Sequence, residues 1–115
     1  MDIIKTNLEN VRKALPVNST ARVETVCGNA LNVAMQYKAD AAQIDIVFAD
    51  PPYRPGRHEI GAADLIKNQA FREWAHNAIL VLEHSKEIPV PFNEWGWSLI
   101  KQKKFGDTMV SFARN

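Results

Sequence analysis

The chain lacks most of the features that mark secreted, membrane or disulfide-rich proteins. It has a single cysteine, Cys27, among 115 residues, which excludes an intramolecular disulfide and a cysteine-rich zinc site. No stretch reaches the roughly 18 apolar residues that a membrane-spanning helix requires. Asp2 and Lys5 interrupt any apolar core of a signal peptide. We therefore expect a cytoplasmic protein, with reduced thiols and no membrane partner.

Charge and composition are equally unremarkable in themselves. The formal net charge is +1, so overall charge gives no argument for a nucleic-acid partner. The 3 histidines do not have the spacing of metal ligands, and we expect no metal site. With 46% hydrophobic residues, the chain can bury a modest core. We expect a single domain over residues 1–115.

The hydrophobic pattern predicts alternating helices and strands. Apolar residues recur at helical spacing over residues 3–15, 29–38 and 62–79, with Asn29 as an N-cap. Short runs rich in apolar residues predict strands over residues 19–28, 44–49 and 78–85, and a hairpin over 97–115 that turns at 105–107. A proline-rich connector at 89–96 cannot be a central strand. This order indicates an α/β sheet in which the C-terminal hairpin forms an antiparallel edge.

The stretch IDIVFADPPY is the most informative part of the sequence. Residues 44–49 are almost wholly apolar, which predicts a strand covered on both faces, as in a parallel sheet. Ligands of such sheets bind beyond the carboxyl ends of the strands, where Asp50 falls. Pro51 and Pro52 fix two φ angles and donate no hydrogen bonds, so their carbonyls can point outward. Asp50 and the Pro51 carbonyl would accept the two N–H bonds of an exocyclic amino group, and Tyr53 would offer a face on which a base stacks.

These residues resemble the bacterial 16S rRNA (guanine-N2)-methyltransferase family of S-adenosylmethionine-dependent class I enzymes. D-P-P-Y after an apolar strand is motif IV of amino-methyltransferases, and IIKTNLENV, CGNAL and KKFGDTMVSFARN resemble three further parts of the family in the same order. The resemblance implies a Rossmann-like fold and N-methylation of a base in rRNA, with guanine N2 favoured. It implies a catalytic set composed of Asp50, Pro51, Pro52 and Tyr53. In that set we expect the ring of Tyr53 to matter more than its hydroxyl.

The resemblance also assigns binding roles outside the catalytic set. Asn29 and Ala30, in the turn CGNAL, match the family position that contacts the cofactor S-adenosylmethionine, although the family usually carries Asp where this chain has Asn29. Arg54 and Arg57 follow the catalytic set and would contact RNA phosphates.

One departure from the family is large. None of the 5 glycines forms the Gly-rich turn on which the family binds its cofactor. The resemblance therefore implies an incomplete fold that lacks the N-terminal strands. We expect this chain alone to bind S-adenosylmethionine weakly or not at all, and to be inactive. We also expect it to associate, either with itself as a homo-oligomer or with a missing N-terminal half.

Other interpretations remain open at this point. D-P-P-Y can be only a turn, Asn29 only a helix cap, and the two arginines only solvated side chains. Lys101, Lys103 and Lys104 are best explained as residues that protect an edge strand from aggregation. The alternatives to an rRNA methyltransferase are a non-catalytic binding or assembly module on the same scaffold, and a remnant of a DNA adenine or cytosine amino-methyltransferase.

Overall fold

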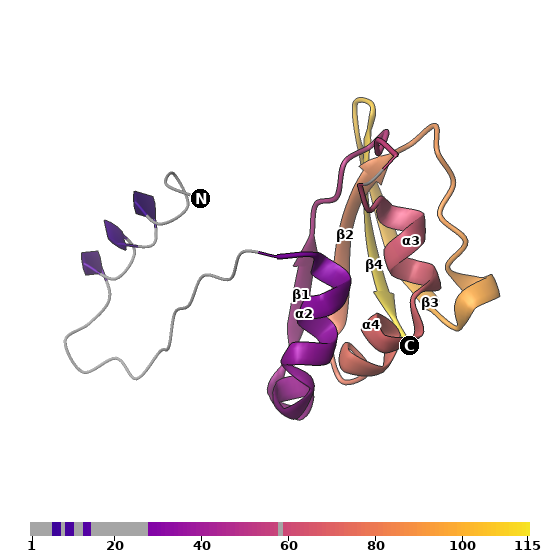
Figure 1. The fold of residues 1–115 in the computed structure, drawn as a ribbon. Coiled ribbons are helices and arrows are strands. Elements are labelled where there is room, and N and C mark those ends of the chain that lie inside the picture. The colour runs from indigo at the N-terminus through magenta and orange to yellow at the C-terminus, as the bar shows by residue number, and fades with distance from the viewer. Residues whose placement is uncertain (1–5, 8, 11–12, 15–27, 58) are drawn as a thin grey trace.

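The computed structural model describes residues 6–7, 9–10, 13–14, 28–57 and 59–115. The helix expected over residues 3–15 and the strand expected over 19–28, with Cys27, lie wholly or mostly outside the described residues. None of the helices within the described ranges is long and apolar enough to cross a membrane. The elements that position the candidate site all lie in residues 28–115 (Figure 1).

The described strands form one mixed sheet in the order β1-β2-β4-β3. These strands are β1 (Ile46–Ala49), β2 (Ile79–Ser85), β3 (Ser98–Phe105) and β4 (Thr108–Arg114). β1 pairs in parallel with β2, whereas β4 pairs antiparallel with both β2 and β3. The predicted hairpin and its position at an antiparallel edge are confirmed, and Gly106 at its turn has a φ of +62°, which glycine adopts without strain.

The helices follow the sequence pattern with one correction. α2 (Ala30–Gln36) begins at the predicted N-cap, because the Asn29 Oδ1 accepts a hydrogen bond from the Leu31 N–H at 2.9 Å. The prediction of a single helix over residues 62–79 is wrong, because the chain forms two helices there, α3 (Ala62–Lys67) and α4 (Gln69–Trp74). Asn68 separates them, because its backbone is extended and its Oδ1 accepts from the Phe71 N–H at 2.8 Å. Its amide thus caps a new helix instead of continuing the old one.

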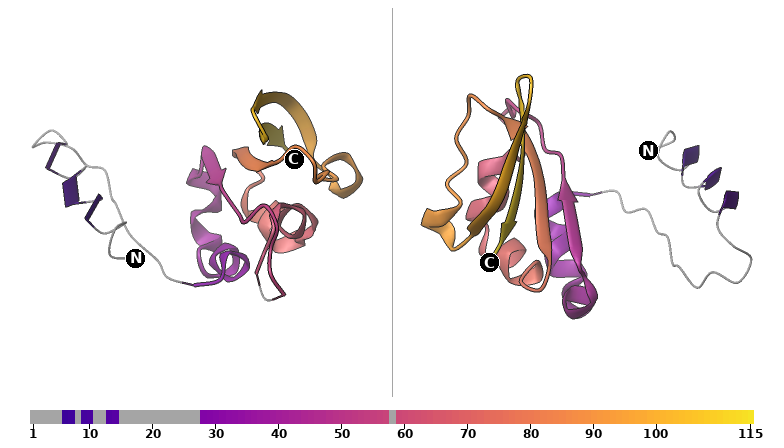
Figure 2. Two further views of the ribbon diagram at one scale, coloured as in Figure 1. Left: turned by 90° about the horizontal axis from the view of Figure 1, so that it is seen from above. Right: turned by 180° about the vertical axis from the view of Figure 1, so that it is seen from behind.

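The helices α2, α3 and α4 lie on one face of the sheet, in front of the strands in Figure 1 and behind them in the rear view of Figure 2. The core forms between these helices and the inward side chains of β2 and β4, with Leu80, Leu82 and Ala113 fully buried. Trp97 closes one side of this core. Its side chain is 1% exposed, and its indole N–H donates to the Ile66 carbonyl at 3.2 Å.

The strand expected over residues 44–49 is shorter and less buried than its sequence indicates. β1 begins at Ile46, since Ile44 ends a short 3-10 helix, η1 (Lys38–Gln43). Val47 and Ala49 pack against the core, but Ile46 and Phe48 are each 66% exposed. The expectation that both faces of this strand are covered is therefore wrong for the part of the chain that the structure describes. Among the described strands β1 lies at an edge of the sheet, and no described helix lies over its second face (Figure 2).

Candidate active site

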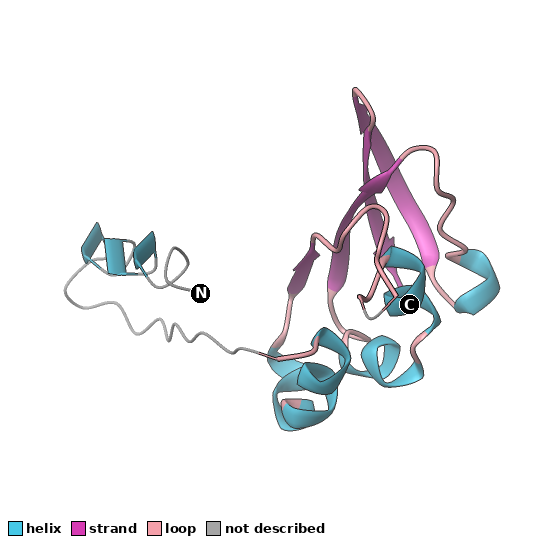
Figure 3. Cartoon of the chain, turned by 45° about the horizontal axis from the view of Figure 1, so that its top comes forward, coloured by secondary structure: helices cyan, strands magenta, loops and turns pink. Residues whose placement is uncertain are grey.

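The turn Asp50–Tyr53, here called the acceptor turn, follows β1 at its carboxyl end. Because β1 runs parallel to β2, the turn lies at the same end of the sheet as the carboxyl end of β2 and the tip of the β3–β4 hairpin (Figures 1 and 3). The Asp50 side chain is exposed and has no hydrogen-bond or ion-pair partner among the described residues. It is therefore a free acceptor at the position where open α/β sheets bind ligands.

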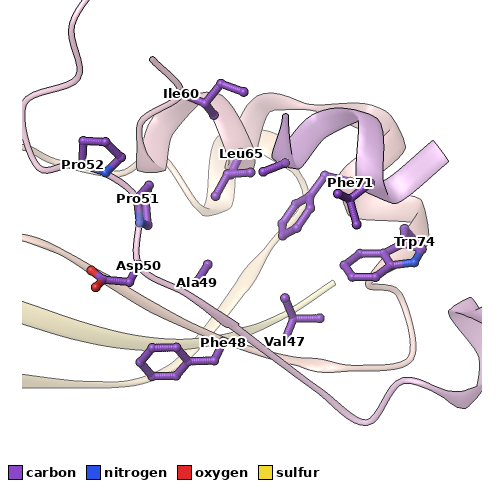
Figure 4. A pocket seen from close by; sticks show the side chains of 12 residues that line it. Val47, Phe48, Ala49, Asp50, Pro51, Pro52, Ile60, Leu65, Phe71 and Trp74 are labelled. Carbon is purple, nitrogen blue, oxygen red and sulfur yellow. The ribbon is translucent and has the colours of Figure 1, made fainter. Parts of the chain in front are cut away.

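The acceptor turn borders a cavity of about 390 Å³ between β1 and the helices. Its lining residues come from α2, β1, the turn and the following helical segment: Ala30, Val33, Val47, Phe48, Ala49, Asp50, Pro51, Pro52, Ile60, Leu65, Phe71 and Trp74. Figure 4 shows Val47 and Ala49 on the side of Leu65, Phe71 and Trp74, whereas the Phe48 ring and the Asp50 carboxylate point away from these side chains. The cavity has the size of a small-molecule site, with apolar walls and one carboxylate near its rim.

The structure brings together some of the residues that the sequence singles out. Ala30, Asp50, Pro51 and Pro52 line the same cavity although α2 and the turn are separated in the chain. Asn29 does not line this cavity, and its side-chain oxygen caps α2. The helix-cap interpretation of Asn29 is thus confirmed, and its contact with a cofactor stays a prediction.

Arg54 and Arg57 lie beyond the turn and do not line the cavity. Both are exposed. Arg54 Nη2 lies 3.4 Å from Glu87 Oε2, in a pair whose side chains are 76% and 63% exposed and which therefore contributes little stability. Arg57 has no ion-pair partner among the residues that the structure describes. A role in RNA binding stays a prediction for both.

The Tyr53 hydroxyl has hydrogen-bond partners that the sequence did not predict. It donates to Glu83 Oε1 at 2.9 Å and lies 2.6 Å from Thr108 Oγ1. The side chain is half-buried, and these hydrogen bonds connect it to β2 and β4. The hydrogen bond with Thr108 by itself lowers the pKa of Tyr53, but burial and the carboxylates of Glu83 and Asp50 outweigh it and leave the pKa above its ordinary value of 10.0. The hydroxyl thus has two partners within the chain, and the expectation that the ring matters more than the hydroxyl for catalysis stays a prediction.

Glu83 and Thr108 are site residues that the sequence analysis did not identify. The only available signal was a charged residue, Glu83, directly after the apolar run ILVL of β2. Thr108 gave none, because its contact with Tyr53 spans 55 residues of sequence.

The loop after the acceptor turn is held in a compact shape by local contacts. The Gly56 N–H donates to Glu59 Oε1 at 2.8 Å. Pro55 packs so closely on Gly61 that a Cβ at Gly61 would lie 2.7 Å from Pro55 Cγ. Only glycine therefore allows this approach, which brings the loop back to the start of α3.

His84 is buried beneath this loop, with 6% of its surface exposed. It borders a second, small cavity together with Pro52 and Tyr53. Its Nδ1 lies 3.1 Å from the Ser85 carbonyl, so Nδ1–H donates, and Nε2 accepts from the Ser111 hydroxyl at 2.7 Å. Burial lowers the pKa of His84 below its ordinary 6.5, although the Ser85 carbonyl offsets part of this effect. With its pKa below 6.5, His84 is neutral in the folded chain at pH 7.

The buried His84 should make folding sensitive to mild acid. Below pH 6.5 the unfolded chain takes up a proton at this position before the folded chain does. The free energy of unfolding therefore decreases as the pH is lowered. The fall begins near pH 6.5 and ends once pH passes the lowered pKa of the folded state. Urea unfolding as a function of pH measures it. His84→Gln should remove this component, whereas His76→Gln, at an exposed histidine, should leave it in place. An unchanged pH dependence in His84→Gln would contradict the assignment.

Within the described ranges, no group of three or more His, Cys, Asp or Glu side chains is placed to hold a metal ion. The chemistry that this geometry offers is hydrogen-bond acceptance by the exposed Asp50 carboxylate, beside an apolar cavity that Pro51 also lines.

The described part of the chain has a mixed α/β fold with a four-stranded sheet, and this fold occurs in solved structures. The structure titled "putative methylase HI0767 from Haemophilus influenzae" matches with a TM-score of 0.58 and 23% identity, over 99% of this chain and 65% of that chain. "Putative methyltransferase yhhF from Escherichia coli" matches with a TM-score of 0.48 and 24% identity, over 97% of this chain and 54% of that chain. The chain thus spans between half and two thirds of the length of these two proteins.

The family follows from the sequence itself. Residues 1–114 match the model of the family described as "Conserved hypothetical protein 95", and the chain belongs to this family. A comparison with curated proteins finds no match.

Proposed function

We propose that the chain carries the amino-acceptor side of an S-adenosylmethionine-dependent N-methyltransferase whose substrate is a base in RNA, with guanine N2 of ribosomal RNA favoured. The observation that carries this proposal is the acceptor turn. It presents the exposed Asp50 carboxylate, which has no hydrogen-bond or ion-pair partner among the described residues, beside a cavity that Pro51 and Ala30 also line. The name of the Haemophilus influenzae structure, a methylase, agrees with it.

In this proposal, the acceptor turn holds the amino group of an unpaired base. The Asp50 carboxylate and the Pro51 carbonyl each accept one N–H bond, which keeps the nitrogen lone pair from conjugating with the ring. Bound S-adenosylmethionine supplies a methyl group on a positively charged sulfur. The chain contributes position and the exclusion of water on the apolar side of the site, where effective concentration accounts for much of the rate.

The cavity walls fit a flat cofactor ring in part. Ala30 and Val33 on α2 and Trp74 on α4 offer the apolar contacts that a purine needs. The sequence has no Gly-rich turn for the rest of the cofactor. We therefore propose that cofactor binding by this chain alone is weak or absent and that it needs the part of the Haemophilus influenzae protein that this chain does not cover.

Arg54 and Arg57 are proposed to contact the phosphates that flank the target base. Both are exposed; Arg54 directly follows the acceptor turn, and Arg57 lies in the same loop. The pair between Arg54 and Glu87 is solvent-exposed, so an RNA phosphate can replace the carboxylate at little cost.

The proposal is tested with two proteins, the chain itself and a fusion that adds the uncovered part of the Haemophilus influenzae protein. We expect calorimetry to show S-adenosylmethionine binding to the fusion and little or none to the chain. The fusion should transfer a labelled methyl group to ribosomal RNA, and not to the same RNA transcribed with inosine, which lacks the amino group, in place of guanosine.

Two results of this experiment would contradict the proposal in different ways. Transfer to adenine or cytosine in single-stranded DNA, in preference to RNA, would favour the DNA methyltransferase alternative. Cofactor binding by the fusion without transfer to any of these substrates would reject the methyltransferase assignment.

A second candidate function, a non-catalytic assembly module, is favoured by one observation. Ile46 and Phe48 form an exposed apolar pair on β1, a strand that has one partner among the described strands. Such a surface is typical of a protein that associates through it. The module and the enzyme are separated by the transfer assay, because only the enzyme methylates RNA.

A further inference from the structure

We propose that Glu83 and Thr108 are positioning residues that hold the acceptor turn in place through the Tyr53 hydroxyl. Their role in catalysis rests on the function proposed above, but the tether itself follows from geometry. It connects the turn after β1 to β2 and β4, and so joins the site to the two strands that contribute Leu80, Leu82 and Ala113 to the buried core.

The sheet register places the two partners side by side. Glu83 pairs with Val110 across β2 and β4, and Thr108 lies two residues from Val110. Because side chains alternate along a strand, Glu83 and Thr108 project from the same face of the sheet. That face is opposite to the one where Leu82 and Ser111 are buried. The tether therefore attaches to the face of the sheet that the helices leave open.

The hydrogen bonds have defined directions. Tyr53 donates its phenol proton to the Glu83 carboxylate, and a bond to a charged acceptor is stronger than one between neutral groups. With its proton committed to Glu83, the phenol oxygen accepts from the Thr108 hydroxyl. Both hydrogen bonds of the phenol are thus satisfied within the chain.

The tether complements the two prolines. Pro51 and Pro52 restrict the backbone next to Asp50, but they do not fix the turn relative to the sheet. Tyr53, at the other end of the turn, fixes the turn relative to the sheet through its bonds to Glu83 and Thr108. Because the pKa of Tyr53 is raised, the phenol keeps its proton, and the tether is intact, throughout the physiological pH range.

The tether is tested first in the chain as it is, by titrating Tyr53 through its absorbance change on ionisation. The chain has 2 tyrosines, so a Tyr37→Phe background leaves Tyr53 as the only one. Glu83→Gln should lower the pKa of Tyr53, because it removes a carboxylate that raises it. Thr108→Val should raise the pKa further, because the lost hydrogen bond stabilised the phenolate. A general loosening of the fold would not move the two variants in opposite directions.

Glu87→Gln is the matched control, because Glu87 holds the neighbouring Arg54 in an exposed pair. It should leave the titration of Tyr53 unchanged. Amide exchange at Tyr53 and Arg54 should become faster in Glu83→Gln and Thr108→Val, and not in Glu87→Gln. Titration curves that do not differ between the wild type and either tether variant would overturn the proposal.

The catalytic consequence is measured in the fusion. Glu83→Gln and Thr108→Val should lower kcat by roughly 10- to 100-fold, since a displacement of about 1 Å can cost 100-fold, with the KM for S-adenosylmethionine little changed. Thr108→Ser should restore most of the loss. An unchanged kcat in an active fusion would overturn the positioning role. An inactive fusion would reject the proposed function, and the titration and exchange experiments would still decide the tether.

Discussion

Asp50→Ala is expected to lower kcat for base methylation by the fusion by about 100- to 1000-fold. The substitution removes one of the two acceptors of the amino group, and loss of one such group from a preorganised site costs about 2.7–4 kcal/mol. The free energy of unfolding should hardly change, because the Asp50 side chain is exposed and has no partner among the described residues. Single-turnover methyl transfer and urea unfolding measure the two effects separately.

Two variants sharpen this prediction. Asp50→Asn keeps one acceptor oxygen without the charge, and its kcat should fall between those of the wild type and Asp50→Ala. Asp45→Ala removes an equally exposed carboxylate just before β1, at the end away from the acceptor turn, and should leave kcat unchanged. If Asp50→Ala retains near-full activity, or unfolds the chain, D-P-P-Y is a structural turn and not an acceptor site.

The second large effect concerns association. The isolated chain is expected to form a homo-oligomer through β1, and Phe48→Asp should convert it to a monomer. Burial of one phenylalanine side chain contributes about 1.5–3 kcal/mol, and a two-fold interface contains two copies. The dissociation constant should therefore rise by roughly 100-fold or more. Light scattering over a range of concentrations measures the change.

Phe105→Asp is the control for this experiment. Phe105 is 60% exposed, close to the 66% of Phe48, but it lies at the end of the opposite edge strand, β3. The Phe105→Asp variant should form the same oligomer as the wild type, with the same molar mass by light scattering. A wild-type chain that stays monomeric at high concentration would contradict self-association, and a monomeric fusion beside an oligomeric chain would show that the added segment covers β1.

The elements that the sequence predicted correctly are those whose signals are local. The hairpin follows from two strand patterns around Gly106, and α2 follows from a capping residue, Asn29, in front of an apolar helical face. The division at Asn68 was missed because an asparagine in a helical pattern can either point to solvent or cap a new helix, and here it caps α4 through the Phe71 N–H. Local propensity is a weak guide at such positions.

The sequence identified the candidate site residues that lie in one short segment, and it missed the contacts that depend on distant segments. Asp50 and the prolines follow from D-P-P-Y alone. The Tyr53 tether requires knowledge of the register between β2 and β4, which the sequence does not display. The exposure of Phe48 was also missed, because an apolar run looks the same whether its second face is covered or open.

The position of β1 has a consequence for how tightly a ligand can bind. β1 has 4 residues and, among the described strands, pairs only with β2, so opening it exposes much less apolar surface than unfolding the β2–β4 core. Its detachment therefore needs less free energy than global unfolding, and it displaces Asp50, which directly follows β1 at the end of the turn away from the Tyr53 tether. A ligand that requires the turn in place binds only the closed fraction of molecules, and its apparent affinity is reduced in proportion to that fraction. Any contact that secures the outer edge of β1 would then strengthen binding at the cavity without touching the ligand.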